Sequence, residues 1–451
     1  MNPARHVVLF SCRSPFLDDA KIYCPLGNLY LKSYLNSYLP AVDVVVADDQ
    51  YDVEDLDRYD RFDVVGISIM TPQRQEAVRL ARAIKNRWPD KTVIAGGPHV
   101  QHYLGEMLNE PCYDYLVPFD GERALVQILS GQPCPRVVHD VLSRDEVMRQ
   151  PPPDRSSENA VEILRQYRYS LGDVAAATML TARGCPEQCT FCEDAMTQVR
   201  WSSVESIATQ LDDIVALGYG GVYIFDDLFA MSITKIRPIC EELRARDLLF
   251  RCNVQARYFT RDGDAMARLL ASSGCYEVAF GAESGNQKIL DNVRKRCTVE
   301  QNYRTVEYAK KHGLIIKAFM LIGLPGEDWE TLRDTEKFIQ SSGVDDFQCV
   351  VYMPFKGTQI RRDVDGGMRI GLSLAPAGDD GEVTGAYGVK GGNSAYEVRT
   401  DALSQADLKA FRDYLVARYR PESHRQRWAP AEDGFFELAH LSNATAGLAD
   451  H

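Results

Sequence analysis

The sequence predicts an α/β protein with an N-terminal parallel sheet of Rossmann or flavodoxin type, a partial (β/α)6 barrel and a small C-terminal region. Short runs rich in β-branched residues alternate with amphipathic helical patterns, as expected where crossover helices join parallel strands. The linker-like stretch QPPPDRSSEN (150–159) separates a first series of five such strands from a second series of six. A chain of 451 residues is long enough for each series to form its own core.

Five apolar runs in the first third of the chain have the composition of strands that are buried on both faces. They are HVVLFS (6–11), VDVVVAD (42–48), FDVVGISIM (62–70), KTVIAGG (91–97) and YDYLVPF (113–119). Between the third and fourth runs, apolar residues at helical spacing predict a helix that ends at Pro89. Sheets of this type bind ligands beyond the carboxyl ends of their strands. Gly66, Gly96 and Gly97 follow or end such strands, so we expect them to contact a cofactor.

Six further strand candidates follow the linker. They are 175–182, 221–227, 249–256, 276–283, 315–323 and 346–355. The clearest helix between them starts with a capping box of Ser202 and Glu205 and ends at Gly218. Six strand–helix units predict an open barrel, because the closed form needs eight. Polar residues at the carboxyl ends of these strands should line the site.

These patterns divide the chain into four parts. We expect a front domain at 1–130, a linker at 131–173, a barrel at 174–355 and a C-terminal region at 356–451. The last part opens with a glycine-rich stretch that runs to residue 395, which indicates a long loop that could contact substrate. A helical pattern at 404–419 precedes a tail that we expect to be disordered.

Composition excludes several classes of function. The chain has 51 Lys and Arg against 64 Asp and Glu, a net charge of −13, which argues against a nucleic-acid partner. No apolar stretch approaches the roughly 20 residues of a membrane helix, and the N-terminus lacks a long apolar signal region, so we expect a cytoplasmic protein without a membrane partner. Nine of the twelve cysteines occur singly, as expected for small buried residues.

The other three cysteines lie together in TARGCPEQCTFCEDA (181–195), where Cys185, Cys189 and Cys192 have the spacing C-x3-C-x2-C. A structural zinc site usually takes four ligands in two separated pairs, and no fourth ligand lies nearby. A redox dithiol would use the last two cysteines and leave the first unexplained. Iron–sulfur clusters are held by thiolates, and three of them would leave one iron of a cubane open to an outside ligand.

Further motifs share the order of the predicted strands. In the barrel they are IFDDLF (224–229), NVQAR (253–257), VAFGAESG (278–285), FMLIGLPGE (319–327) and MPFKGT (353–358). With the cysteine loop, they resemble the radical S-adenosylmethionine superfamily. VVGISIMTPQ (64–73), VIAGGPHV (93–100) and VPFDGERAL (117–125) are similar to the subgroup with an N-terminal cobalamin-binding domain. The resemblance implies a [4Fe–4S] cluster on the three cysteines, S-adenosylmethionine on its open iron, and cobalamin in the front domain.

The resemblance also implies contacts with S-adenosylmethionine. The candidate cofactor-binding residues of the barrel are Phe191, Asp226, Asp227, Arg257, Glu283 and Ser284. The two aspartates stand where many members have Gly-Gly-Glu beside the methionyl amino group, and they share a candidate catalytic role with Glu283. Arg257 is a candidate partner of the methionyl carboxylate. The sequence has no D-x-H-x-x-G, so no histidine ligand to cobalt is indicated, and His99 is interpreted as a turn residue.

The resemblance implies an enzyme that cleaves S-adenosylmethionine to a 5′-deoxyadenosyl radical and abstracts hydrogen from a small natural-product-type substrate. Cobalamin-dependent methylation of carbon is the expected outcome, with an electron donor such as flavodoxin or ferredoxin as partner. The alternative is radical dehydration, epimerisation or cyclisation of an amino sugar or similar polar metabolite, without cobalamin. An acidic mouth containing Glu193 and Asp194 with the two aspartates would suit such a substrate. An iron–sulfur sensor would leave the barrel motifs without a purpose.

Overall fold

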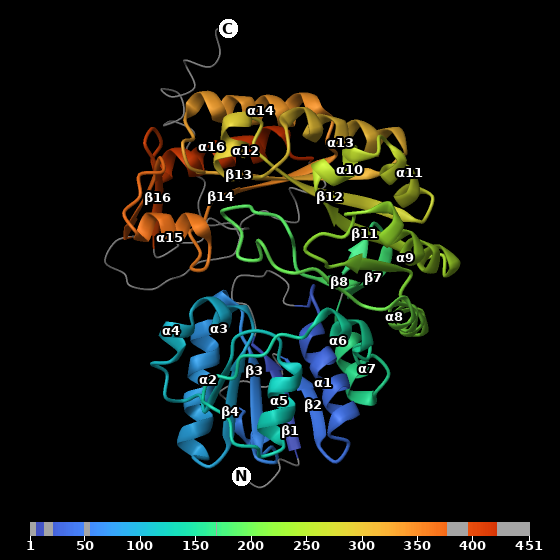
Figure 1. Ribbon diagram of the computed structural model, residues 1–451, viewed down its shortest axis with the longest axis vertical. Helices are drawn as coiled ribbons and strands as arrows, with labels where there is room; N and C mark the ends of the chain where they lie inside the picture. The colour runs from blue at the N-terminus through green and yellow to red at the C-terminus, as the bar shows by residue number, and fades with distance from the viewer. Residues whose placement is uncertain (1–5, 13–20, 49–54, 168, 377–395, 422–451) are drawn as a thin grey trace.

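The computed structural model describes residues 6–12, 21–48, 55–167, 169–376 and 396–421. Figure 1 shows two sheet domains, the front domain in blue to teal and the barrel in green to orange, with the loop after β8 between them. About half of the predicted glycine-rich loop (377–395 of 356–395) and nearly all of the predicted tail lie outside the described residues. The described half is not a continuous loop, because it contains a helix (Gln359–Asp365) and a strand (Leu372–Pro376). None of the helices within the described ranges is long and apolar enough to cross a membrane.

The front domain is a five-stranded parallel sheet, which confirms the predicted class. Its strands are β1 (His6–Ser11), β2 (Asp43–Ala47), β3 (Val64–Ser68), β4 (Thr92–Gly96) and β5 (Tyr115–Val117), in the spatial order β2-β1-β3-β4-β5. Its helices are α1 (Leu26–Tyr38), α2 (Arg74–Arg87), α3 (Pro98–His102), α4 (Leu104–Met107) and α5 (Glu122–Leu129), with 3-10 turns at Leu56–Tyr59 and Thr71–Gln73. Apolar clusters on both faces of the sheet explain why these strands are continuously apolar.

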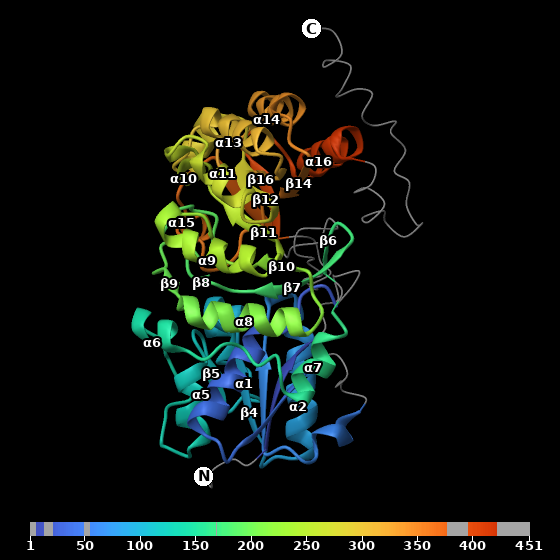
Figure 2. The same ribbon diagram turned by 90° about the vertical axis from the view of Figure 1, so that its right-hand side faces the viewer.

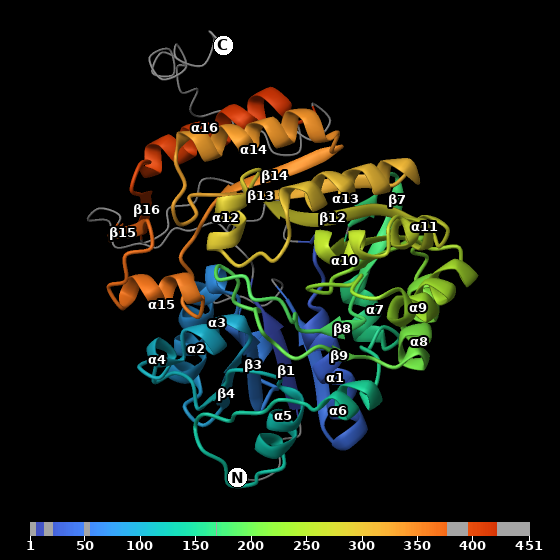
Figure 3. The same cartoon turned by 45° about the horizontal axis from the view of Figure 1, so that its top comes forward.

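The second sheet is the predicted open barrel. Its parallel strands are β7 (Val174–Met179), β10 (Gly221–Ile224), β11 (Leu249–Val254), β12 (Cys275–Glu283), β13 (Ile315–Ile322) and β14 (Asp346–Val351), and β6 (Ser170–Leu171) adds an antiparallel edge beside β7. Its helices are α8 (Val204–Ala216), α9 (Ile233–Ala245), α10 (Ala256–Arg261), α11 (Ala265–Ala271), α12 (Gln287–Asn292), α13 (Val299–Lys311) and α14 (Trp329–Ser342). Figures 2 and 3 show these helices along the outer face of the curved sheet.

Shorter elements complete the chain. They are α6 (Arg144–Arg149) and α7 (Glu158–Leu164) in the linker, the hairpin of β8 (Ala182–Arg183) and β9 (Arg200–Trp201), and α15 (Gln359–Asp365), β15 (Leu372–Pro376), β16 (Tyr396–Thr400) and α16 (Gln405–Tyr419) at the C-terminal end. One predicted cap is wrong: α8 is capped by Ser203, whose side chain accepts from the backbone N–H of Ser206. Ser202 instead donates its backbone N–H to Thr181, 2.9 Å away, which continues the β8–β9 pairing.

Candidate functional site

The three predicted cluster ligands lie on the loop between β8 and β9, at the carboxyl end of β7. Gly184 opens the loop with φ = 92°, and a Cβ atom there would lie 2.5 Å from the carbonyl oxygen of Gln198, so only glycine fits. The backbone N–H of Cys185 donates to Thr197 Oγ1 (2.8 Å), and the N–H of Thr197 donates to the carbonyl of Cys185 (3.0 Å). The two ends of the loop are thus held together before any cluster binds.

Backbone hydrogen bonds also attach the middle of the loop to the barrel. Thr190 donates to the carbonyl of Val293 and accepts from the N–H of Ile360, both at 3.0 Å. A third bond, from Cys192 N–H to the carbonyl of Cys189 (3.1 Å), closes a turn between two of the cysteines. The loop is therefore anchored on two sides of the barrel mouth.

The thiols fit an iron–sulfur cluster better than a single metal ion. Burial raises the pKa of Cys185 to about 11 and that of Cys192 to about 12, and it also raises the pKa of Cys189. Within the described residues, no three His, Cys, Asp or Glu side chains gather so as to hold one metal ion. In a cubane each thiolate binds a different iron, so the ligands need not converge on one point. The donor set is therefore appropriate for a cluster.

Asp226 follows β10 and is 1% exposed. Its carboxylate accepts from the backbone N–H groups of Thr181 (2.7 Å) and Ala182 (3.2 Å) and from the Thr181 hydroxyl. Burial raises the pKa of Asp226 to about 7, against the lowering effect of these hydrogen bonds. The side chain thus fixes the chain entering the cysteine loop, which is a positioning role.

Asp227 is the exposed member of the pair. One of its oxygens accepts from the N–H of Gly184 at 3.0 Å. Partial desolvation, then the nearby carboxyl of Asp194, raises the pKa of Asp227 to about 6. Contact with a methionyl amino group stays a prediction for both aspartates, and the geometry favours the exposed one.

Arg257 reaches the cysteine loop from the start of α10. Its guanidinium forms an ion pair with Glu187, which lies between the first two cysteines and is 3% exposed. Tyr258 donates its hydroxyl to the same carboxylate at 2.7 Å. Arg257 Nε and Glu187 Oε2 are buried without a hydrogen-bond partner among the described residues. Because the guanidinium is already paired with Glu187, contact with the methionyl carboxylate of S-adenosylmethionine stays a prediction.

Glu283 ends β12 with φ = 60°, an uncommon conformation for a side chain of this size. Its carboxylate pairs with Lys295 at 2.7 Å, and both residues are under 9% exposed. Although desolvation lowers it, the charge of Glu283 raises the pKa of Lys295 above its ordinary value. Lys295 Nζ also lies 5.9 Å from the ring centroid of Phe191, which packs against the barrel core. Ser284 faces elsewhere, because its hydroxyl lies 3.2 Å from that of Thr335 in α14.

A second cavity lies at the carboxyl ends of the front-domain strands. Its volume is about 270 Å³, and its walls include Gly66, Gly96 and Gly97 as well as Gly121. Gly66 leaves no room for a side chain of its own, because a Cβ atom there would lie 2.9 Å from the side chain of Leu9. The cavity is slightly smaller than typical small-molecule pockets, so it would hold a part of cobalamin rather than the whole cofactor.

Barrel residues close this cavity. Leu180 and Arg183, which lead into the cysteine loop, form part of its wall. Arg183 donates to Asp120 (2.9 Å) and Glu122 (2.7 Å) of the front domain, and to Gln150 of the linker (2.9 Å). Glu122 is 2% exposed, so these charges are paired largely out of water. The charged network joins the cofactor side of the front domain to the cluster loop of the barrel.

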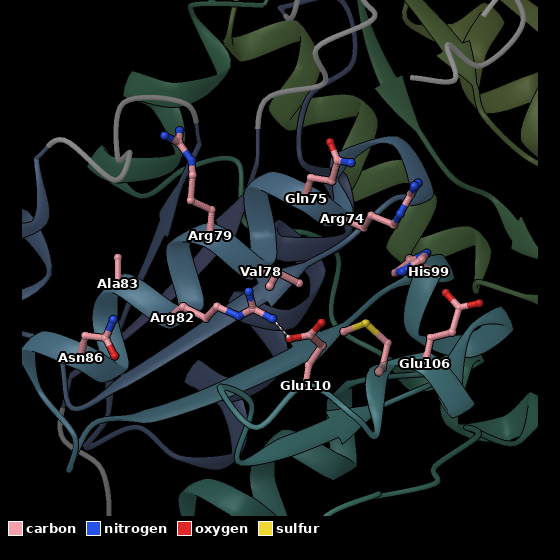
Figure 4. Close-up of a pocket in the computed structure, with 11 residues that line it drawn as sticks. Arg74, Gln75, Val78, Arg79, Arg82, Ala83, Asn86, His99, Glu106 and Glu110 are labelled. Atoms are coloured by element: carbon pink, nitrogen blue, oxygen red, sulfur yellow. Dashed lines mark hydrogen bonds and ion pairs between the residues drawn. The ribbon is translucent and has the colours of Figure 1, made fainter. Parts of the chain in front are cut away.

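His99 lies away from this cavity. Its ring is 2% exposed, stacks on Tyr103 with a centroid separation of 4.6 Å, and lies 3.3 Å from Thr71 Oγ1. Figure 4 shows it at the rim of a different pocket, of about 560 Å³, between α2 and α4, with Arg82 and Glu110 paired across it. The interpretation of His99 as a turn residue is wrong, because α3 begins at Pro98 and His99 is its second residue.

Comparison with known proteins gives the class. Residues 179–339 match the Radical SAM superfamily, and residues 20–129 match the B12 binding domain. The chain therefore carries a radical S-adenosylmethionine domain preceded by a cobalamin-binding domain, the domain order that the resemblance implied. Members of this family use a [4Fe–4S] cluster and S-adenosylmethionine, and the front domain adds cobalamin, as the resemblance implied.

Individual relatives include both methyltransferases and a cyclase. An "uncharacterized methyltransferase PH0819" of Pyrococcus horikoshii is 28% identical over 74% of this chain and 77% of its own. The anaerobic magnesium-protoporphyrin IX monomethyl ester cyclase of Rubrivivax gelatinosus is 26% identical over 65% of this chain, which spans 57% of the cyclase. The radical S-adenosylmethionine methyltransferase TsrM of Kitasatospora setae, solved with cobalamin and a [4Fe–4S] cluster, shares the fold, with a TM-score of 0.71 at 18% identity over 85% of this chain and 82% of TsrM.

Several residues of the site were missed from the sequence. Arg183 and Lys295 are polar residues whose partners lie 61 and 12 positions away, so no local pattern marks them. Glu187 is equally inconspicuous, because its place between two cluster cysteines does not indicate that it pairs with Arg257 of α10. The motif VPFDGERAL contains Asp120 and Glu122, but nothing in the motif indicates that these carboxylates pair with Arg183 of the barrel.

Proposed function

We propose that this enzyme methylates an unactivated carbon of a small natural-product-type substrate. When bound, the cluster and S-adenosylmethionine supply a 5′-deoxyadenosyl radical, and methylcobalamin supplies the methyl group. One observation carries the proposal: Arg183, two residues before the first cluster cysteine, also forms the wall of the glycine-lined cavity. The two cofactor sites thus share a boundary, as transfer of a methyl group to a radical formed beside the cluster requires.

The chain's own residues supply binding and orientation. The three cysteines would hold the cluster, and Asp227 and Arg257 are the candidates for the amino and carboxylate ends of S-adenosylmethionine. Asp226 holds the cysteine loop in register with β10. Gly66, Gly96 and Gly97 leave room for the cobalamin side of the site. We propose a low-potential electron donor such as flavodoxin or ferredoxin as partner.

The test is a mass measurement under anaerobic conditions. Protein reconstituted with cluster and cobalamin is incubated with trideuteromethyl S-adenosylmethionine, a reductant and candidate substrates. A product that gains one trideuteromethyl group in place of hydrogen, together with 5′-deoxyadenosine, supports the proposal. A product that has lost water or closed a ring without added label supports the alternative radical reaction. Absence of 5′-deoxyadenosine under every condition contradicts both.

A further inference from the structure

An aromatic surface lies where the front domain meets the barrel. Tyr23 is 42% exposed and Phe225 is 44% exposed, and their ring centroids are 5.3 Å apart. Behind them, Tyr223 lies 5.0 Å from Phe225 and stacks on Tyr169 at 5.3 Å. We call these four rings the aromatic platform. Two large rings left exposed side by side, on a rigid aromatic base, are typical of a binding surface.

The platform faces the inside of the barrel. Val222 and Ile224 belong to the core between the sheet and its outer helices, so the alternating Tyr223 faces the opposite side. Arg251 confirms this side, because it lies over the Tyr223 ring at 4.5 Å and is the partner of Tyr223 in the strand pairing. Phe225 faces the same side, two residues nearer the carboxyl end of the strand and immediately before Asp226.

The front domain contributes the other exposed ring. Tyr23 lies in the segment that precedes α1, and its neighbour Cys24 contacts Thr178 of β7 through Sγ and Oγ1 at 3.0 Å. The platform is therefore built from both domains, next to the strand that leads into the cysteine loop. A molecule lying on it would contact both domains, beside the residue that precedes Asp226.

A polar group beside the platform is not satisfied. Asn253 follows Arg251 by two residues, so it faces the same side of β11 at the level of Phe225. Its Nδ2 donates to the carbonyl of Asp226 at 3.1 Å, which fixes the amide. Its Oδ1 is buried and accepts no hydrogen bond from any described residue. A buried acceptor of this kind is costly unless a bound molecule supplies the donor.

We infer that the aromatic platform binds the substrate, and that the substrate carries a planar ring with an N–H or O–H donor at its edge. The ring stacks on Tyr23 and Phe225, and the donor satisfies Asn253 Oδ1. This class differs from the amino sugar of the alternative reaction, because the ring of an amino sugar is not planar. The inference rests on the proposed function, because it places the substrate in the space between its two cofactors.

Binding is measured without turnover, on protein loaded with cluster and cobalamin. The probes are indole, N-methylindole, which lacks the donor, and cyclohexylmethanol, which lacks the ring. Indole should bind most tightly, and N-methylindole several-fold more weakly. Phe225→Leu and Tyr23→Leu should each weaken indole by about tenfold, as loss of an aromatic contact and its buried area predicts. Tyr23→Phe keeps the ring and should bind as the unaltered protein does.

Tyr38→Leu is the matched control, because Tyr38 is 58% exposed at the end of α1, outside the platform. It should leave indole binding unchanged. Equal binding of indole and cyclohexylmethanol, no binding of indole, or equal loss in the control and the platform variants would overturn the inference. Cluster and cobalamin absorbance report the folding of each variant. Suppose that these cofactors bind and 5′-deoxyadenosine forms, but the platform variants bind indole as tightly as the unaltered protein does. In that case the inference fails and the proposed function stands.

Discussion

Replacing Arg183 with methionine should loosen the attachment of the two domains. The change removes the only ion-pair partner of Glu122 among the described residues and leaves its buried carboxylate with a single hydrogen bond from Gln150 Nε2 at 2.7 Å. Breaking a buried pair in this way costs about 3–5 kcal/mol. The side chain of Arg183 is 20% exposed, so water enters more easily and the lower end, about 3 kcal/mol, is expected. Asp120 keeps Arg200 and contributes less.

Urea unfolding of the cofactor-free protein, followed by circular dichroism, measures this loss. Adding Glu122→Gln to Arg183→Met should restore about half of it, because the second change removes the uncompensated charge. The control is Arg123→Met: Arg123 also pairs with two carboxylates, Asp140 and Glu146, but is 47% exposed, so its loss should cost less than about 1 kcal/mol. An Arg183→Met protein as stable as the control, or strictly additive losses in the double variant, would refute the reasoning.

Three other changes test the site and the fold. Alanine at any one of the three loop cysteines should abolish cluster iron and sulfide, whereas Cys275→Ala, in β12, should retain both; analysis of reconstituted protein distinguishes them. Asp226→Ala removes an acceptor from two backbone N–H groups and should lower the free energy of unfolding by roughly 2–4 kcal/mol, whereas a residue that served only S-adenosylmethionine would leave it unchanged. Burial raises the pKa of Glu327 from 4.5 to about 8, so the folded protein holds its proton over a range in which the unfolded chain releases it. Stability should therefore fall as pH rises through this range, by up to about 1.4 kcal/mol per pH unit, and Glu327→Gln should flatten the slope in urea titrations at several pH values.

The strands were predictable because their signal is local. The apolar run HVVLFS (6–11) coincides with β1, because both faces of that strand are buried. The strand predicted at 249–256 starts where β11 starts and extends two residues beyond its end. The three-cysteine spacing was equally local, because one loop supplies the whole donor set. Short elements, such as the β8–β9 hairpin, were missed because two residues on each side carry no periodicity.

Long-range polar contacts could not be predicted in the same way. Asp226 was expected to face the cofactor, but nothing in IFDDLF shows that its carboxylate turns back to the end of β7. The pairing of Arg183 with Glu122 joins positions 61 residues apart on different domains. Such pairs depend on how the two sheets are oriented, which the pattern of apolar residues does not determine. The role of Tyr23 in the aromatic platform was not predictable for the same reason, because the rings beside it belong to the barrel.

The shared wall between the glycine-lined cavity and the cysteine loop also limits how this architecture can be recombined. A chimera that grafts a foreign vitamin-binding module onto this barrel would bring its own side chains to face Arg183 and Arg200, leaving two cations at the graft without counter-charges. Successful exchange would therefore require introducing into the foreign module an acidic pair that corresponds to Asp120 and Glu122. Protein engineers should treat the join, rather than either half, as the unit of design.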